Sequence, residues 1–249
     1  MIFAARRRIR RDLRRVTRQP RPGPVRRQAQ SPGCRSSRCT AGARTFEESQ
    51  MDDCPIEKVD AGHEPTMAER LLSPDRERWA DSATVLSHLG IASDARIADI
   101  GCGPGYYTVR LAGVAGRGLV YALDVDPDML ELCRLTVSKS GLKNVLVRRC
   151  GEYEFGLEDM TLDLVFLSCV VHHADDHVRF LVAARRLLKA SGRCAMLEWV
   201  ERESDFGPPR ERRIGHDRLM TLASEAGFAG LEYHSLSEHQ YLVLAASGN

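Results

Sequence analysis

A short apolar run that passes directly into a glycine-rich turn constrains this chain more than any other feature. The run is Ile97 to Ile100, and the turn is Gly101 to Gly105 (Gly-Cys-Gly-Pro-Gly), ahead of a helical pattern that begins at Tyr106. Glycine permits positive φ and lets a ligand approach the main chain closely. A strand, a glycine-rich turn and a helix in this order predict a ligand-binding loop at the carboxyl end of a parallel strand.

The rest of the chain alternates short β-rich runs with helical patterns, which predicts a parallel sheet covered by helices on both faces. The last two runs are separated by a four-residue turn, so an antiparallel hairpin is expected at the end. The expected fold class is α/β, a Rossmann-like mixed sheet. We expect strands at Arg96–Ile100, Leu119–Asp124, Asn144–Arg148, Leu162–Ser168, Gly192–Trp199, Leu231–Ser235 and Gln240–Ala245. We expect helices at Pro65–Leu72, Ser73–Leu89, Tyr106–Ala112, Pro127–Lys139 and Val178–Leu188, the last closed by Ala190-Ser191-Gly192.

The charge changes sign near residue 50. Residues 1–50 hold 14 Arg, no Lys and 3 acids, a net charge of +11, whereas residues 51–249 hold 22 Lys and Arg against 31 Asp and Glu, a net charge of −9. We therefore expect an Arg-rich, disordered leader at 1–50 and one folded domain at 51–249. The acidic domain argues against a nucleic-acid partner for the folded part.

Three interpretations of the leader fit its composition. It has the Arg-rich, acid-poor character of a mitochondrial transit peptide and the charge of a nucleic-acid-binding arm. It is also consistent with translated upstream sequence, and Met51 at the charge reversal favours this third interpretation. A cytoplasmic location is expected, or a mitochondrial one if the leader is a transit peptide.

The eight cysteines include no Cys-x-x-Cys pair, so we expect reduced thiols and no metal. No stretch approaches the roughly 18 consecutive apolar residues of a membrane span. The sequence does not predict the oligomeric state.

The spacing of the glycines disfavours a dinucleotide. It is Gly-x-Gly-x-Gly, with Tyr106 where the dinucleotide fingerprint has its third glycine. Asp124 ends the next strand 19 residues after Gly105, near the separation expected for a ribose-binding carboxylate. Asp126 precedes Pro127 and is the more natural cap for the helix that follows.

The strand that ends at Ser168 is followed by Cys169 and, three residues on, by His172 and His173. Small and polar groups therefore lie at the carboxyl edge of the sheet, where open α/β sheets bind their ligands.

Together these features resemble the class I S-adenosylmethionine-dependent methyltransferases, in particular the UbiE-type ubiquinone and menaquinone group. The resemblance covers about Gly62 to Ala246. It rests on the segments Ala98–Tyr106, Val120–Asp124 with Met129-Leu130, Leu187–Arg193 and Phe206–Pro209.

The resemblance implies S-adenosylmethionine as cofactor. Gly101, Gly103 and Gly105 would border its methionine moiety, Asp124 would hold the ribose, and Asp99 would order the loop or approach the ligand's amino group. Ser168 and Cys169 would complete the cofactor site.

One segment departs from the family pattern. Many relatives carry Gly-Asp-Ala after the third strand, with the Asp on the adenine amine, whereas this chain has Cys150-Gly151-Glu152-Tyr153. Glu152 would then take the adenine role from the adjacent position.

The expected reaction is methyl transfer by in-line displacement to an unidentified small-molecule acceptor. Alignment of the acceptor supplies much of the rate in such a reaction, so a base is optional. For a hydroxyl or carbon acid, His172 or His173 is the candidate base. The competing interpretation is that one of these histidines caps or packs against the helix that begins near Asp176.

The segment after the fifth strand is expected to shape acceptor specificity. Trp199 would wall the acceptor or pack in the core. The arginines of this segment would hold an anionic acceptor or remain solvated; they are Arg210, Arg212 and Arg213. The segment Met67 to Leu89, with Trp79, would cover the site as a lid.

Two other functions stay open. One is a protein that binds S-adenosylmethionine without turnover, and the other, against the glycine spacing, is an NAD-dependent oxidoreductase.

Overall fold

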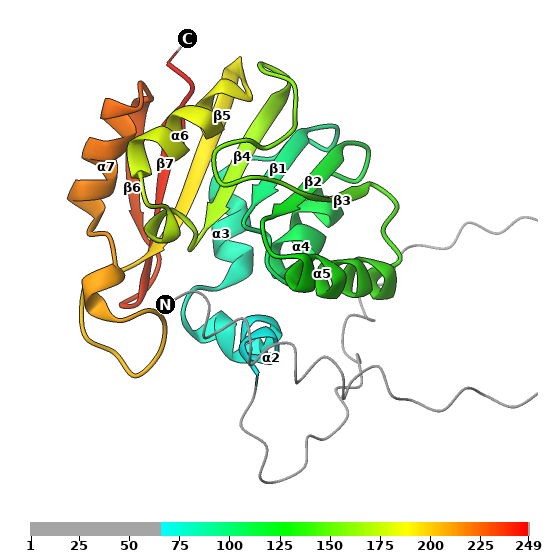
Figure 1. Ribbon diagram of the computed structural model, residues 1–249, viewed down its shortest axis with the longest axis horizontal. Coiled ribbons are helices and arrows are strands. Elements are labelled where there is room, and N and C mark those ends of the chain that lie inside the picture. The colour runs from blue at the N-terminus through cyan, green and yellow to red at the C-terminus, as the bar shows by residue number, and fades with distance from the viewer. Residues whose placement is uncertain (1–65, 249) are drawn as a thin grey trace, which may run out of the picture. The chain divides into compact units, whose positions relative to one another are not determined.

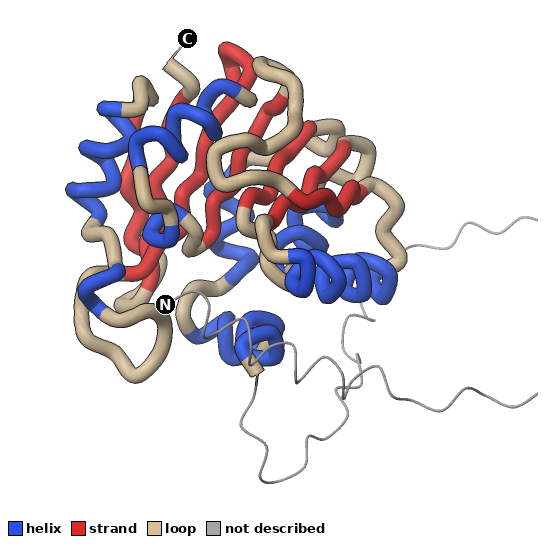
Figure 2. The backbone as a smooth tube through the Cα atoms, viewed as in Figure 1, coloured by secondary structure: helices blue, strands red, loops and turns tan. Residues whose placement is uncertain are grey.

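Residues 66–248 are described by the computed structural model, and they form an α/β unit around a seven-stranded sheet (Figures 1 and 2). The strand order is β3-β2-β1-β4-β5-β7-β6. Strands β1 to β5 are parallel, and β7 runs antiparallel to both β5 and β6. The expected Rossmann-like mixed sheet is confirmed. The predicted leader, 1–50, and the predicted domain start at Met51 lie outside the described residues.

The strands are β1 (Arg96–Ile100), β2 (Leu119–Asp124), β3 (Val145–Arg149), β4 (Leu162–Ser168), β5 (Leu188–Trp199), β6 (Ala229–Ser235) and β7 (Gln240–Ala246). The α-helices are α2 (Met67–Leu72), α3 (Ser82–Leu89), α4 (Tyr106–Val114), α5 (Pro127–Ser140), α6 (His177–Arg186) and α7 (His216–Glu225). Short 3-10 helices are η1 (Pro74–Arg78), η2 (Val171–His173) and η3 (Arg210–Arg212).

Polar side chains set the helix starts that the sequence predicted. The Ser73 hydroxyl accepts a hydrogen bond from the Asp75 N–H at the start of η1, with Pro74 at the first helical position. Asp126 caps α5 by accepting from the Asp128 N–H, which confirms its predicted role. Such a cap satisfies an amide that has no partner inside the helix.

The helix predicted over Ser73–Leu89 is wrong as a single element. It is divided into η1 and α3, because the Asp81 carboxylate accepts the Thr84 N–H and starts a new helix. The Glu77 carboxylate reinforces the division by accepting both the N–H and the hydroxyl of Ser82. Gly90 closes α3 in the left-handed conformation.

Several other boundaries differ from the prediction. The helix expected over Val178–Leu188 ends at Arg186, and Ala190-Ser191-Gly192 lies inside β5 instead of closing that helix. Strand β5 begins at Leu188, because an irregular stretch pairs Leu188 with Leu162 before the regular ladder starts at Arg193. Gly192 thus belongs to the strand, where a Cβ would lie 2.8 Å from the Leu162 carbonyl oxygen. Strand β3 begins and ends one residue later than predicted, and α7 was not predicted at all.

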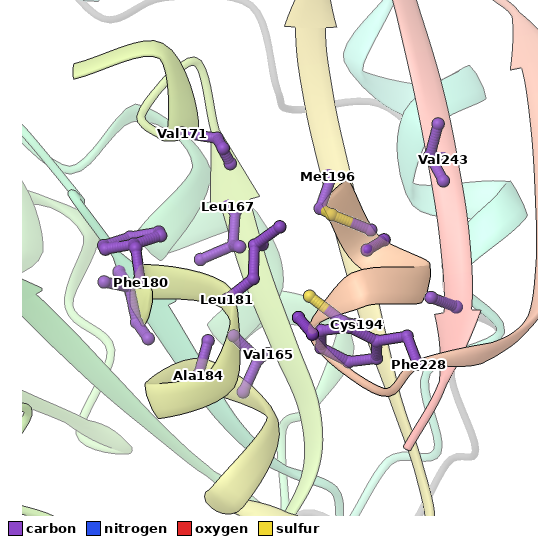
Figure 3. Close-up of a cluster of buried hydrophobic side chains, with 14 of the residues drawn as sticks. Val165, Leu167, Val171, Phe180, Leu181, Ala184, Cys194, Met196, Phe228 and Val243 are labelled. Carbon is purple, nitrogen blue, oxygen red and sulfur yellow. The ribbon is translucent and has the colours of Figure 1, made fainter. Parts of the chain in front are cut away.

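Helices cover both faces of the sheet. Buried residues of α6 and α7 pack against one face, and buried residues of α3, α4 and α5 pack against the other. Figure 3 shows Leu181 and Ala184 of α6 beside Val165 and Leu167 of β4, and Phe180 belongs to the same cluster. Alternate residues along the inner strands, such as β1 and β4, therefore enter different cores, as the period of two requires.

The carboxyl ends of the parallel strands lie together at one end of the sheet (Figure 1). Strand order reverses between β1 and β4, which is the position where open α/β sheets bind ligands. Helix α2 lies at this same end (Figure 1). Within residues 66–248, no helix combines the length and apolar character that a bilayer crossing requires.

Leu181 tests the packing of α6 on the sheet. Its side chain is fully buried, so Leu181→Ala should lower the free energy of unfolding by about 2–5 kcal/mol. Leu135→Ala on α5, where the side chain is 48% exposed, serves as the control and should cost less than about 1 kcal/mol. Urea denaturation of both variants checks this, and equal losses would contradict the assignment of the core.

Candidate active site

The glycine-rich turn is anchored to the neighbouring strand. The N–H groups of Gly101 and Cys102 both donate to the Leu123 carbonyl of β2, at 2.8 and 3.0 Å. Gly101, Gly103 and Gly105 all have positive φ, at 73°, 53° and 93°. Glycine adopts these angles without the steric cost that a side chain brings. The turn is therefore a fixed structure that follows from the sequence.

The three glycines face different surroundings. A Cβ at Gly101 would lie 2.5 Å from Val170, and one at Gly105 would lie 3.0 Å from the Cys133 sulfur. A Cβ at Gly103 would meet only Leu71 of α2, at an ordinary 3.9 Å. Gly101 and Gly105 are therefore required by packing. Gly103 is the glycine with space beside it for a ligand.

Asp124 joins the turn to the end of β2. One carboxylate oxygen accepts the Gly103 N–H at 2.9 Å and the other accepts the Asp126 N–H at 2.9 Å. Desolvation by burial raises its pKa, and the backbone N–H donors of Asp126 and Gly103 act in the opposite direction. Each oxygen retains a further lone pair, so the carboxylate can still accept the two hydroxyls of a ribose.

Asp99 is a second carboxylate beside the turn. It is only 1% exposed and accepts a hydrogen bond from the Thr108 hydroxyl of α4 at 2.6 Å. Desolvation raises its pKa to about 7; the Thr108 bond and Arg76 lower it, and the charge of Asp124 raises it further. The contact with Thr108 ties β1 to the first turns of α4, in line with the loop-ordering role that the sequence suggested.

Two desolvated carboxylates beside an open glycine fit a cationic ligand that carries hydroxyl groups. S-adenosylmethionine meets this description, with its sulfonium, its ammonium group and its ribose. A dinucleotide would bring a diphosphate to the same turn, where the Asp124 carboxylate would repel it. The charge of the site therefore agrees with the glycine spacing in disfavouring NAD.

The end of β4 supplies a tight corner. Cys169 adopts a positive φ of 53°, and its N–H donates to the Leu197 carbonyl at 2.7 Å. Its sulfur receives the Gln240 side-chain N–H at 3.2 Å, and burial raises the thiol pKa to about 12. Cys169 is thus a neutral thiol at physiological pH. The buried Ser168 hydroxyl makes no hydrogen bond within residues 66–248, so it is available to a ligand.

His172 forms a pair with a residue that the sequence did not indicate. Its Nδ1 lies 2.7 Å from a Glu198 carboxylate oxygen, and the side chains are 2% and 0% exposed. The His172 main-chain N–H donates to the other oxygen at 3.3 Å. Glu198 lies at the end of an apolar strand, where the sequence pattern gave no sign of a buried charge. Its place beside His172 depends on the pairing of β4 with β5.

His173 is a different kind of group. Its side chain stacks beside His172, with ring centroids 4.2 Å apart. Desolvation lowers its pKa to about 4; the charge of Glu198 acts in the opposite direction and that of Arg212 in the same direction. His173 is therefore neutral at physiological pH. Asp176 caps α6 by accepting the Arg179 N–H, so neither histidine caps this helix. The other half of the competing interpretation, that one of them packs against α6, stays a prediction.

Glu152 lies on the exposed loop after β3. Its carboxylate accepts the Asp175 N–H at 3.2 Å, which connects this loop to the one before α6. Main-chain contact between Cys150 N–H and the Asp124 carbonyl, at 3.0 Å, keeps the loop next to the glycine turn. The adenine role of Glu152 stays a prediction.

Arg213 holds the loop after β5 together. Neither prediction for it was right, because the residue is only 7% exposed and faces inward. Its guanidinium donates to one hydroxyl and to the carbonyls of four loop residues: Ser204 Oγ, Val200, Arg202, Phe206 and Pro208. Arg210 and Arg212, on η3, are exposed. The loop therefore has a defined shape that one buried cation determines.

Three aromatic residues from distant segments meet beside this loop. Trp79 lies 5.1 Å from Trp199 and stacks on Phe206 at 5.6 Å, measured between ring centroids. The Trp79 carbonyl also accepts a hydrogen bond from the Ser237 hydroxyl in the β6–β7 turn. Trp199 is 5% exposed, and Gly207 passes directly over its indole. The segment predicted as a lid is therefore fixed to both the loop and the hairpin.

Comparison with known proteins identifies the type of domain in this chain. A family model described as "Methyltransferase domain" matches residues 98–196. The solved structure of a SAM-dependent methyltransferase from Aquifex aeolicus is 29% identical, with a TM-score of 0.69 over 72% of this chain and 95% of that one. The chain therefore contains a methyltransferase domain of the class I, S-adenosylmethionine-dependent type. The cofactor of this methyltransferase is S-adenosylmethionine.

Curated relatives match a shorter stretch of the methyltransferase. The demethylmenaquinone methyltransferase of Bacillus subtilis is 25% identical over 128 residues, 51% of this chain and 54% of the relative. The tRNA U34 carboxymethyltransferase of Actinobacillus succinogenes is 30% identical over 112 residues, 43% of this chain and 33% of the relative. The chain thus spans about half and a third of these relatives. Their names include a small molecule and a tRNA as substrates.

The different surroundings of Gly101 and Gly103 lead to a first prediction for the site. Gly101→Ala should lower the unfolding free energy by more than about 2 kcal/mol, because the new methyl group would overlap Val170 at a positive φ. Gly103→Ala should cost about 1 kcal/mol in stability but should weaken S-adenosylhomocysteine binding at least tenfold. Urea denaturation and calorimetry separate the two effects; normal cofactor affinity in folded Gly103→Ala would contradict this assignment.

Asp99 leads to a prediction about pH. Its pKa rises from an ordinary 3.8 to about 7 on folding, so between these values the folded state holds more protons than the unfolded state. This contribution to stability is present below about pH 4 and is lost as pH rises through 7. Asp99→Asn should therefore gain on the order of 4 kcal/mol relative to wild type between pH 4 and pH 7.5.

Denaturation curves across this pH range test the Asp99 prediction. The exposed Asp159→Asn is the control and should follow the wild-type pH dependence. Parallel curves for Asp99→Asn and wild type would show that Asp99 titrates near its ordinary value.

Proposed function

We propose that this methyltransferase transfers the methyl group of S-adenosylmethionine to a small-molecule acceptor from which His172 removes a proton. The observation that carries the proposal is the buried pair of His172 with Glu198 at the carboxyl ends of β4 and β5. Such a pair is expensive to bury, because both groups lose water. A base held by a carboxylate is a recurring solution in catalytic sites.

Glu198 determines which nitrogen of His172 can act. A carboxylate accepts, so Nδ1 carries the hydrogen in the 2.7 Å contact and Nε2 retains its lone pair. Nε2 can then take a proton from an acceptor hydroxyl, enol or carbon acid. Glu198 also stabilises the imidazolium that forms. It is a positioning residue that acts through His172.

The chemistry needs little more than alignment and a base. S-adenosylmethionine, when bound, supplies a methyl group on a positively charged sulfur that leaves as a neutral thioether. The acceptor's lone pair forms the new bond to carbon as the carbon–sulfur bond breaks, and His172 holds the released proton. Correct alignment of reacting groups has effective molarities of about 10⁵ to 10⁸ M. The contacts of Trp79 with Trp199 and Phe206 would help to keep water out during the reaction.

A small acceptor is supported by charge and by the aromatic cluster. Residues 51–249 carry −9, which opposes contact with a phosphate backbone. The contacts of Trp79 with Trp199 and Phe206 make the region beside the loop after β5 apolar, which suits a planar acceptor. A demethylmenaquinone-like acceptor, as in the B. subtilis relative, matches this surface better than the tRNA of the other relatives.

Methyl transfer by His172 variants tests the proposal. With a panel of phenols and hydroquinones, full-length wild type should release S-adenosylhomocysteine, and His172→Asn should lower kcat by about 10²- to 10⁴-fold. Glu198→Gln should lower kcat in the same direction, while neither variant changes S-adenosylhomocysteine affinity more than about threefold. His216→Asn, with a side chain 47% exposed on α7, is the control.

Acceptors of different acidity can show whether His172 acts as a base or only packs in the site. The loss in His172→Asn should shrink for acceptors that are already ionised, such as nitrophenolates, because they need no base. An equal loss for every acceptor would contradict the proton-transfer role. Cofactor binding without turnover on any acceptor would favour the non-catalytic binding protein instead.

A further inference from the structure

Arg76 lies over the start of α4, the helix that follows the glycine-rich turn. It belongs to η1, and its guanidinium carbon is 4.4 Å from the centre of the Tyr106 ring and 5.5 Å from that of Tyr107. These two tyrosines open α4 immediately after the turn. Its Nη1 donates to the Leu71 carbonyl at 3.0 Å. The Leu71 side chain is the contact nearest to the open side of Gly103.

Most N–H donors of the Arg76 guanidinium are not used in hydrogen bonds to the described residues. An arginine offers five N–H donors in a planar fork, and within residues 66–248 the Leu71 contact is the hydrogen bond that Arg76 makes. No carboxylate of these residues lies within ion-pair distance of it. Arg76 is also half-buried, so water meets its needs only in part.

Arg110 provides a direct comparison, since it covers the same Tyr106 ring at 3.7 Å. Its guanidinium donates to Ser82, to the Tyr106 carbonyl and to Glu77, and the Glu77 contact is an ion pair of 3.1 Å. Contacts within the protein therefore account for the charge and the donors of Arg110. Arg76, in contrast, contacts one carbonyl and two aromatic rings.

The electrostatic surroundings restrict what could meet Arg76. Its charge lowers the pKa of both Asp99 and Cys169, so it lies near the ends of β1 and β4. The cationic sulfonium of the cofactor would repel it. The cofactor carries a single anionic group, the carboxylate of its methionine moiety, and a guanidinium fork binds a carboxylate through two parallel hydrogen bonds.

We propose that Arg76 binds the α-carboxylate of the cofactor's methionine moiety. The inference rests on S-adenosylmethionine as the cofactor in the proposed function and is independent of the role of His172. The cofactor would then lie between opposite charges, with the Asp99 and Asp124 carboxylates on its cationic and ribose portions and Arg76 on its anionic end. Residues from the lid segment and from the sheet would share one ligand.

Two related ligands test the proposal in full-length protein. S-adenosylhomocysteine has the amino-acid carboxylate, and 5′-methylthioadenosine has the same nucleoside and thioether without it. In calorimetry, Arg76→Met should weaken S-adenosylhomocysteine about 10- to 100-fold and leave 5′-methylthioadenosine within about twofold. Arg76→Lys should retain part of the affinity, because a lysine keeps the charge and loses the fork.

Arg78→Met is the matched control, since Arg78 belongs to the same 3-10 helix with a side chain 82% exposed. Unchanged affinity of Arg76→Met for S-adenosylhomocysteine would overturn the proposal. This holds even if the same variant raises the KM for the acceptor. So would equal losses for both ligands, which would mean that Arg76 only supports the lid. Wild type that binds neither ligand would overturn the cofactor assignment itself, whereas failure of His172 alone would leave Arg76 unaffected.

Discussion

The two hydrogen bonds that Asp124 accepts from main-chain amides hold this site together. One comes from the middle of the glycine turn and the other from the start of α5, so a single carboxylate connects β1, β2 and the helix that follows. The carboxylate is partly desolvated, and the peptide N–H groups offset part of that cost. Without this link, the turn would be anchored through Leu123 alone. The remaining groups of the site take their positions relative to this turn.

The positions of the charged side chains at the carboxyl edge of the sheet reflect function as well as stability. Asp99 and Asp124 lie together at a cost, since each raises the free energy of ionising the other. On the far side, the buried Glu198 carboxylate accepts hydrogen bonds from His172 rather than from solvent. A fold that was selected for stability alone would replace such groups with apolar side chains. Their presence at one edge marks it as the place where the chain does chemistry.

The sequence predicted the parts of the structure that depend on local patterns. The β1–turn–α4 unit, the ends of β2 and β4, and the Asp126 cap follow from alternation, glycine and capping residues, all read within a few positions. Glu198 and Arg76 could not be found this way. Their partners are 26 residues away or belong to another element, and their chemistry arises only when strands and lid come together.

The loop after β5 shows the same limit. Three arginines within four residues suggested a solvated or anion-binding cluster, yet Arg213 is turned inward and serves as a cross-link for the carbonyls around it. The sequence positions of Arg210, Arg212 and Arg213 did not indicate which of the three side chains is buried. Likewise, the break between η1 and α3 required knowledge that Asp81 competes as a cap within a continuous helical pattern.

The unequal surroundings of the three glycines have a consequence beyond this chain's own ligand. Two of them are explained by neighbours inside the protein, Val170 and Cys133, and would be needed even if nothing ever bound. A descendant that abandoned the cofactor would still be obliged to keep them. A glycine-rich motif can therefore persist because a helix and a sheet pack closely, whether or not a ligand binds. The glycine that indicates ligand binding is Gly103, because the space beside it is not filled by the protein.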